Sequence, residues 1–283
     1  MINTLLSQLS ILNPYKIEQC QNKEDGSLYN VWKIEKEDKK YILKQAKGYE
    51  KVLYETLLKK VENGVPKYYG ATRYNDIDYV LIEYIEGVDL CKCNRDLLIK
   101  TLDALIEIQN QFWDIKLDVG YTYEDSLKSC LLRKDYLKNP LLEKTYEEFL
   151  KIYQAIPKTL CHHDLLPFNV IVGGKGYLID WEYAGILPYA SSITRLIAHG
   201  KNDVEYLFYM NDEDKKFAVE YYYENLIKAK GITYQEYIKT INYFLFYEYT
   251  EWIMLGNKYK DADMDRFNYY MKLSLSHIEI NNL

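Results

Sequence analysis

The sequence predicts an α+β protein with two lobes, a small one built on an antiparallel sheet with one main helix and a larger helical one. Residues 1–86 show short strand patterns around one helical stripe, whereas the chain from residue 96 onward mostly has helical period. The exception is 160–182, where two short strands carry a polar stretch. We therefore expect a sheet-rich lobe at 1–86 and a helical lobe at 87–283.

The amino-terminal elements follow from periodicity and from turn residues. A short amphipathic helix is expected at 3–12, ended by Asn13-Pro14, and a longer helix from Tyr49 to Glu62, ended by Gly64 and Pro66. Alternating apolar residues predict strands at 27–35, 40–45 and 78–87, and the polar "KEDKK" stretch makes the turn between the first two.

The carboxy-terminal part is predicted to be helical except around 160–182. Helices are expected at 96–113, 124–137, 141–155, 190–200, 203–209, 213–229 and from 234 to the end with breaks. Within 160–182, "NVIV" and "GYLID" are predicted strands, joined by the glycine-rich turn "GGKG".

Composition excludes several classes of protein. The 283 residues are 48% apolar, and a net charge of −6 argues against a nucleic-acid binder, which needs a basic face. The 5 cysteines are scattered and odd in number, as expected of reduced thiols. The amino terminus lacks a signal-peptide pattern, and no apolar run reaches about 18 residues. We expect a soluble, cytoplasmic protein without a membrane span.

The stretch "CHHDLLPFNVIV" at 161–172 concentrates polar groups in one loop. Asp164 and Asn169 are bridged by Pro167, and Asp180 follows on the returning strand, near Asn169 at the same end of the hairpin. Carboxylate and amide oxygens favour a hard cation such as Mg²⁺. His162 and His163 alone do not make a zinc site, because a third ligand at suitable spacing is missing.

This pattern, H-x-D-x(4)-N followed by a strand, a turn and "IDW", resembles the aminoglycoside phosphotransferase and choline kinase superfamily, whose fold is protein-kinase-like. The resemblance implies transfer of the γ-phosphoryl group of ATP or GTP to a hydroxyl group. It implies that Asp164 orients and deprotonates the hydroxyl, while Asn169 and Asp180 hold Mg²⁺ against the phosphates.

The amino-terminal lobe tests the resemblance independently. A kinase-like fold needs a lysine on its third strand and a glutamate on the next helix. Lys44 fits the first requirement, and Glu50 and Glu55 compete for the second. We choose Glu50, because it lies in the middle of the apolar stripe, where a charge needs a partner. The spacing of six residues resembles the spore-coat-kinase-like branch.

Two further nucleotide contacts are implied by the resemblance. The segment "EDGSLYNVW" would be the phosphate-covering loop with Ser27 at its tip, although a bare turn explains it equally well. The segment "LIEYIEG" would hold the adenine base through the backbone of Glu83 and Ile85.

One departure from the family pattern concerns the support of the 162–169 loop. The aspartate that usually follows in D-P-x-x-D-L-A is absent, and Ser191 or Ser192 stands near its place. Tyr189, Arg195 or His199 could substitute for it. His162 is expected to brace the loop by hydrogen bonding, and His163 is assigned no role.

The acceptor site is expected on the carboxy-terminal helices. In "NYFLFYEYTEWIML", Glu248, Glu251 and Trp252 lie close together, and acidic groups beside an aromatic ring suit a cationic small molecule. A solvated acidic face over a tyrosine-rich core is the competing interpretation. The leading hypothesis is an aminoglycoside-phosphotransferase-like small-molecule kinase. The alternatives are a choline or ethanolamine kinase and a nucleotide-binding or coat-associated module without turnover.

Overall fold

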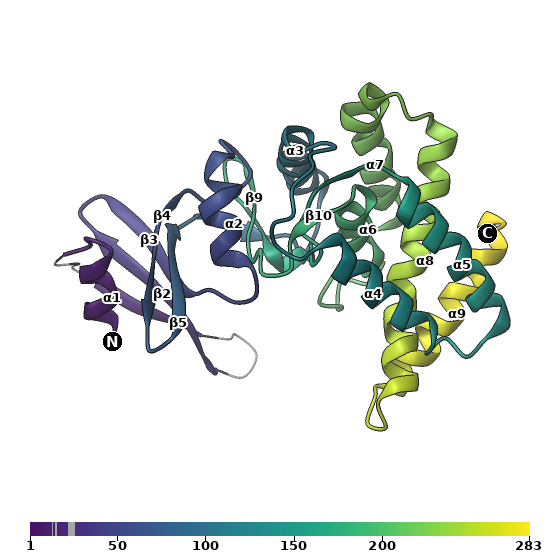
Figure 1. Cartoon of the computed structure of the whole chain (residues 1–283), viewed down its shortest axis with the longest axis horizontal. Coiled ribbons are helices and arrows are strands. Elements are labelled where there is room, and N and C mark those ends of the chain that lie inside the picture. The colour runs from purple at the N-terminus through teal and green to yellow at the C-terminus, as the bar shows by residue number, and fades with distance from the viewer. Residues whose placement is uncertain (13, 15, 22–25) are drawn as a thin grey trace.

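The computed structural model describes residues 1–12, 14, 16–21 and 26–283. An antiparallel sheet occupies one end of the molecule and a group of helices the other (Figure 1). Within the described residues this sheet has five strands in the order β1-β2-β3-β5-β4. They are β1 (Lys16–Gln21), β2 (Leu28–Lys36), β3 (Lys39–Gln45), β4 (Tyr68–Tyr74) and β5 (Ile77–Glu83). The arrangement confirms the predicted α+β class.

The two faces of the sheet are covered differently, as the alternation of side chains requires. On β5, Tyr79 and Leu81 join a small cluster with α1 (Ile2–Gln8). Val80 and Ile82 point to the other face, where α2 (Glu50–Thr56) packs, and belong to the large core that continues into the helical part.

The chain leaves the sheet at a point where the backbone is crowded. β5 ends at Glu83, and β6 (Val88–Asp89) already pairs with β8 (Val170–Val172), which pairs in turn with β9 (Gly176–Leu178). At Gly87 a Cβ atom would lie 2.4 Å from the carbonyl oxygen of Val172, so only glycine fits there. The lobe boundary at 86/87 stays a prediction.

The helical part consists of helices with side-chain caps and a small strand pair. Asn94, Asn139 and Thr233 cap the helices that follow them, Thr233 through a capping box with Glu236. The helices are α3 (Arg95–Gln111), α4 (Tyr123–Lys134), α5 (Pro140–Ala155), α6 (Ala190–Ala198), α7 (Asp212–Tyr222), α8 (Tyr234–Lys258) and α9 (Met264–Asn281). The pair is β7 (Lys158–Cys161) with β10 (Gly185–Pro188).

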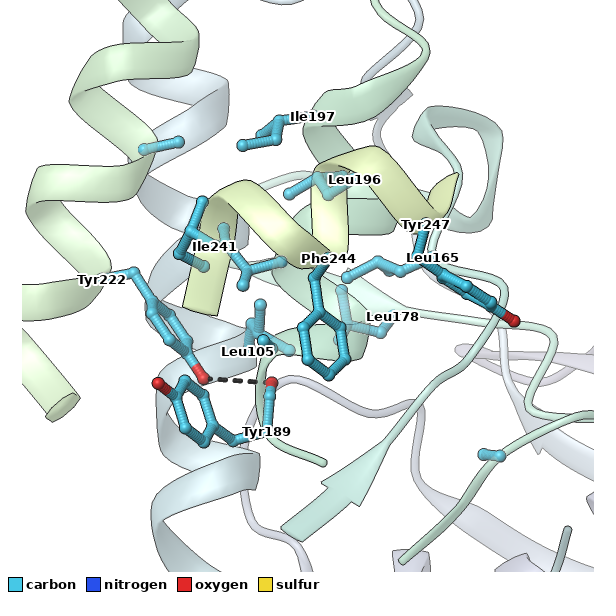
Figure 2. Close-up of a cluster of buried hydrophobic side chains, with 14 of the residues drawn as sticks. Leu105, Leu165, Leu178, Tyr189, Leu196, Ile197, Tyr222, Ile241, Phe244 and Tyr247 are labelled. Carbon is cyan, nitrogen blue, oxygen red and sulfur yellow. Dashed lines mark hydrogen bonds between the residues drawn. The ribbon is translucent and has the colours of Figure 1, made fainter. Parts of the chain in front are cut away.

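Buried tyrosines fill much of the helical core, and several of them use their hydroxyl groups in hydrogen bonds. The Tyr222 hydroxyl donates to Gln109 Oε1 at 2.5 Å and lies 3.5 Å from the Tyr189 carbonyl oxygen (Figure 2). Leu165, next to Asp164 in sequence, is fully buried in the same cluster as Phe244 (Figure 2). The polar loop is therefore fixed to the core by its own apolar residue.

Three helix predictions were wrong in extent or in kind. The helix expected at 3–12 ends at Gln8, shortly before Ser10, which has a φ of 61°. The helix expected at 49–62 ends at Thr56, whose hydroxyl bonds the Val52 carbonyl and competes with the helical pattern, and a 3₁₀ turn (Leu58–Lys60) follows. The segment 203–209 is not helical. Its end pairs with other segments instead, since the Tyr209 N–H donates to the Cys91 carbonyl at 2.8 Å.

The strand predictions missed several short or edge strands and extended two strands too far. β1 and β4 are edge strands with little burial contrast, and β7 and β10 have only four residues each. The strand predicted at 78–87 ends at Glu83. The strand predicted to reach Asp180 ends at Leu178, because Asp180 has a φ of 66°, which a strand cannot contain.

Two further features concern the cysteines and the hydropathy of the helices. All five cysteines lie in the described ranges, and none of them forms a disulfide. Across the described ranges, no helix combines the length and the hydropathy that crossing a bilayer would require.

Candidate active site

Lys44 on β3 and Glu50 at the start of α2 form a buried ion pair. Lys44 Nζ lies 3.0 Å from Glu50 Oε1, and the Glu50 residue is only 1% exposed. Glu55, the competing candidate, pairs instead with Lys51 at 3.1 Å on the outer side of the helix. The position of Glu50 in the apolar stripe therefore brings it, rather than Glu55, to Lys44.

Asp180 approaches the same lysine from the other side. Lys44 Nζ also pairs with Asp180 Oδ1, so one ammonium group links the sheet, α2 and the turn after β9. Burial raises the pKa of Glu50 to about 7, against the attraction of Lys44. Burial opposes the charge of Lys44, but the two carboxylates raise its pKa to about 12. The lysine thus stays cationic.

We expect Glu50→Gln to raise the KM for the nucleotide about tenfold, because a neutral amide holds the ammonium about 1.4 kcal/mol more weakly. Glu55→Gln is the matched control, since it removes a carboxylate from the same helix without touching Lys44. Steady-state kinetics at varied nucleotide concentration measure both. A larger effect from Glu55→Gln would contradict the assignment.

The 162–169 loop is closed by its own hydrogen bonds. Asn169 Nδ2 donates to the Asp164 carbonyl oxygen at 2.8 Å, and the Leu166 N–H donates to the same oxygen at 2.8 Å. The Ile179 N–H donates to the Asn169 carbonyl at 2.9 Å, which places Asn169 beside the turn that carries Asp180. The predicted closeness of Asn169 and Asp180 arises in this way.

Asn169 and Asp180 offer oxygen ligands that fit Mg²⁺. The amide nitrogen of Asn169 is engaged with Asp164, so its Oδ1 is the atom left for a cation. Asp180 pairs with Lys44 through Oδ1, its side chain is 46% exposed, and its Oδ2 remains available. One amide and one carboxylate oxygen, with water and phosphate oxygens, make the kind of ligand set that Mg²⁺ takes.

Support for the loop comes from His162 and Ser192. Because its partner is the Ile179 carbonyl, 2.6 Å away, His162 Nε2 must carry the hydrogen. Burial lowers the pKa of His162, in keeping with a neutral ring. The His162 N–H donates to Ser192 Oγ at 2.9 Å. Ser192 thus bonds the loop backbone at the place where the family pattern has an aspartate.

The three other residues suggested as braces behave differently. Arg195 reaches the loop, but at the Asp164 carboxylate instead of the backbone. His199 contacts Arg195 at 3.1 Å, and the carbonyl of Tyr189 accepts from Gln109.

His163, to which the sequence assigns no role, lies at the wall of the cavity beside Asp164. Its backbone has a φ of 63°, and its ring stacks on Tyr121 with 5.2 Å between centroids. The side chain lines the cavity beside Asp164, where burial lowers its pKa to about 4. A neutral ring at this wall adds no charge to the cavity.

A cavity of about 340 Å³ adjoins Asp164 and contains two of the predicted acceptor residues. Glu248 and Glu251 of α8 face it, so the structure brings them together with Asp164. Trp252 lies instead in a neighbouring, more apolar cavity of about 350 Å³. Its ring is covered by the Arg266 guanidinium, 4.5 Å from the centroid. Trp252 is therefore in a different cavity from Glu248, whereas Glu251 lines both cavities.

Arg195 on α6 connects the carboxylates of this cavity. Its Nε and Nη2 donate to Asp164 Oδ1 at 3.2 and 3.0 Å, and its Nη1 donates to Glu248 Oε2 at 3.1 Å and Glu251 Oε2 at 2.5 Å. Although burial acts the other way, Arg195 and neighbouring cations lower the pKa of Glu248 to about 2. His199, Glu248 and Glu251 are close enough to hold a metal ion, but the guanidinium already contacts all three.

Only part of the two segments that are expected to contact the nucleotide lies within the described residues. Of "EDGSLYNVW", Glu24 and Asp25 lie outside the described residues, and Ser27 is exposed just before β2. The Glu83 N–H donates to the Lys67 carbonyl at 2.9 Å, whereas the Ile85 N–H has no backbone acceptor within the part of the chain that the structure describes.

Comparisons with known proteins identify the family of the chain and proteins that share its fold. A family model described as the phosphotransferase enzyme family matches residues 24–207. A curated protein of Metamycoplasma hominis, named only as an uncharacterized protein, is 24% identical over 184 residues, 64% of this chain. Those residues are 32% of that protein, so the chain spans about a third of its length.

Solved structures share the fold at low sequence identity. An aminoglycoside phosphotransferase from Alicyclobacillus acidocaldarius matches with a TM-score of 0.64 at 13% identity, over 98% of this chain and 92% of that one. An aminoglycoside-3'-phosphotransferase of type VIII gives a TM-score of 0.57 at 16% identity, over 86% and 96%.

A third structure was solved with ligands bound. It is a spectinomycin phosphotransferase in complex with ADP and spectinomycin, with a TM-score of 0.54 at 15% identity over 95% of this chain and 94% of that one. The match to the family model, which covers most of the chain including the 162–169 loop, confirms the resemblance seen in the sequence. The chain belongs to the phosphotransferase enzyme family and shares its kinase-like fold with the aminoglycoside phosphotransferases.

Proposed function

We propose that the protein transfers the γ-phosphoryl group of ATP or GTP to a hydroxyl group of a small molecule that carries an amine. The observation that supports this most directly is the position of Asp164 at the wall of a cavity of about 340 Å³ shared with Glu248 and Glu251. The cavity has the size of a small-molecule site. On the nucleotide side, Lys44 stands between Glu50 and Asp180.

Asp164 is the proposed general base. Oδ1 already accepts two hydrogen bonds from Arg195, so Oδ2 is the oxygen that takes the acceptor hydroxyl. As the acceptor oxygen bonds to the γ-phosphorus, the bond to the β-phosphate oxygen breaks, the hydroxyl proton moves to Asp164, and the nucleoside diphosphate leaves.

The other residues bind and orient the nucleotide. Lys44 would hold the phosphates, kept in place by Glu50, and the backbone of Glu83 and Ile85 would hold the base. Asn169 and Asp180 would hold Mg²⁺, which neutralises charge on the phosphates when it is bound. The role of Ser27 in covering the phosphates stays a prediction. Five cysteines without a disulfide among them fit the cytoplasm, which supplies the nucleotide.

The amine is proposed from the two glutamates. Each accepts from Arg195 through Oε2, and within the described residues neither Oε1 has a hydrogen-bond partner. An ammonium group of the acceptor can bind there. Trp252 is left out of this proposal, because Arg266 covers its ring. A module without turnover is the second candidate, but the contacts of Ser192 and Arg195 with the loop supply the support that the missing aspartate had placed in doubt.

The proposal predicts acceptor-dependent release of nucleoside diphosphate. ADP or GDP release is measured with Mg²⁺ over aminoglycosides, amino sugars, choline and ethanolamine, with ethylamine as the matched compound that lacks the hydroxyl. We expect release with at least one hydroxylated amine and none with ethylamine. Nucleotide binding without acceptor-dependent release from any compound would instead favour the module without turnover.

A further inference from the structure

Arg133, near the end of α4, presents a fixed guanidinium group to the cavity beside Asp164. The guanidinium stacks 4.0 Å from the centre of the Tyr247 ring, and Nη1 donates to the Tyr247 carbonyl at 2.9 Å. Both residues line the cavity. Stacking and the single hydrogen bond hold the planar group in one orientation.

The contacts of Arg133 differ from those of Arg195 in the same cavity. Arg195 uses all three of its nitrogens on the carboxylates of Asp164, Glu248 and Glu251. Within the described ranges, no carboxylate oxygen lies within 4.0 Å of an Arg133 nitrogen, and Nε and Nη2 have no hydrogen-bond partner. The Arg133 side chain is half-buried and pairs with no carboxylate of the described chain, so its Nε and Nη2 are free to bind an anion that enters with the ligand.

Charge and shape limit what that anion can be. Asp164, Glu248 and Glu251 carry three negative charges against two from Arg133 and Arg195, so the cavity is negative before any ligand binds. A doubly charged phosphate would meet repulsion from three carboxylates. A carboxylate carries one charge and matches the two free donors of a guanidinium edge.

We infer that the acceptor is a small hydroxylated amino acid and that Arg133 binds its carboxylate. This inference rests on the proposed function. The amine then lies at Glu248 and Glu251, and the hydroxyl at Asp164. Arg133 is a residue that determines specificity, since an amino alcohol without the carboxylate leaves its donors unpaired.

Matched ligand pairs test this inference by binding as well as by turnover. Serine differs from ethanolamine, and homoserine from 3-aminopropan-1-ol, only by a carboxylate. Each is titrated calorimetrically into the protein with ADP and Mg²⁺. We expect the amino acid of at least one pair to bind at least tenfold more tightly than its amino alcohol.

Arg133→Gln should weaken binding of that amino acid by about 10- to 100-fold and leave the amino alcohol within twofold. The glutamine amide can still donate to the Tyr247 carbonyl, and Arg133→Lys, which keeps the charge but loses the fork, should retain part of the preference. Arg73→Gln, on the exposed edge strand β4, is the control and should change neither ligand.

Several outcomes would overturn the inference: equal affinities within both pairs, no binding of either amino acid, or equal losses for both members of a pair in Arg133→Gln. Phosphorylation of amino alcohols with no preference for the carboxylate would leave the proposed function standing and this inference refuted. Tight binding of an amino acid without phosphoryl transfer would refute the proposed function and the role of that amino acid as acceptor, and would leave only the contact of Arg133 with its carboxylate standing.

Discussion

Asp164→Asn is expected to lower kcat by about 10²- to 10⁴-fold, the range that a general base contributes. The amide oxygen of asparagine can still accept the two hydrogen bonds from Arg195, so the local structure should survive. What is lost is the ability to take a proton from the acceptor hydroxyl. Asp164→Ala should lose at least as much.

The measurement separates catalysis from binding. With the acceptor found in the ADP-release assay, kcat should fall, whereas the Kd for ADP should stay within a fewfold range, since Lys44 pairs with Glu50 and Asp180 and not with Asp164. Asp214→Asn is the matched control, because Asp214 also accepts from an arginine, Arg95, at 2.7 Å but lies outside the cavity. Near wild-type kcat in Asp164→Asn would refute the role of the base.

The parts of the site that could be predicted are those encoded over short stretches of sequence. Asp164 and Asn169 lie in one loop, and the hairpin that follows returns to Asn169 through the Ile179 N–H. The choice of Glu50 over Glu55 needed only the helical period and the cost of a buried charge.

The arginines could not be predicted in the same way, because their roles depend on how distant helices pack. Arg195 is on α6 and reaches α8, and Arg133 is on α4 and stacks on a ring from α8. Nothing in the residues around either arginine indicates these partners. The sequence offered Arg195 only as one of three substitutes for the missing aspartate.

Trp252 shows the limit of reasoning from one helix. Residues 248, 251 and 252 lie at helical spacing on one side of α8, so the period groups them. That side of the helix borders two cavities, and Trp252 faces the one where α9 supplies Arg266. The strands missed at the sheet edges have a similar cause, since an edge strand with one neighbour shows little alternation.

Arg195→Ala is expected to lower the free energy of unfolding by about 3–5 kcal/mol at neutral pH, the cost of leaving a buried charge without its partner. Glu248 is 5% exposed and would lose the Nη1 contact at 3.1 Å. Glu251 and Asp164 would lose the same guanidinium, so kcat should fall as well. Arg95→Ala is the control, an arginine paired with one carboxylate outside the cavity.

The lowered pKa of Glu248 sets how the stabilisation by Arg195 changes with pH. Glu248 has a pKa lowered to about 2, by Arg195 and other cations against the effect of burial. A carboxyl whose pKa is lower in the folded than in the unfolded chain stabilises the fold above the unfolded pKa of about 4.5 and loses that effect as the pH falls toward 2. For Glu248 the lost stability is about 3 kcal/mol.

The difference in stability between the wild type and Arg195→Ala should therefore be largest near pH 7 and should shrink below about pH 4.5. Urea unfolding at a series of pH values measures it. Adding Glu248→Gln to Arg195→Ala should restore part of the stability at pH 7, because the unpaired charge is removed, but it should not restore kcat. A difference that stays constant from pH 7 to pH 3 would mean that Arg195 stabilises the fold by packing alone.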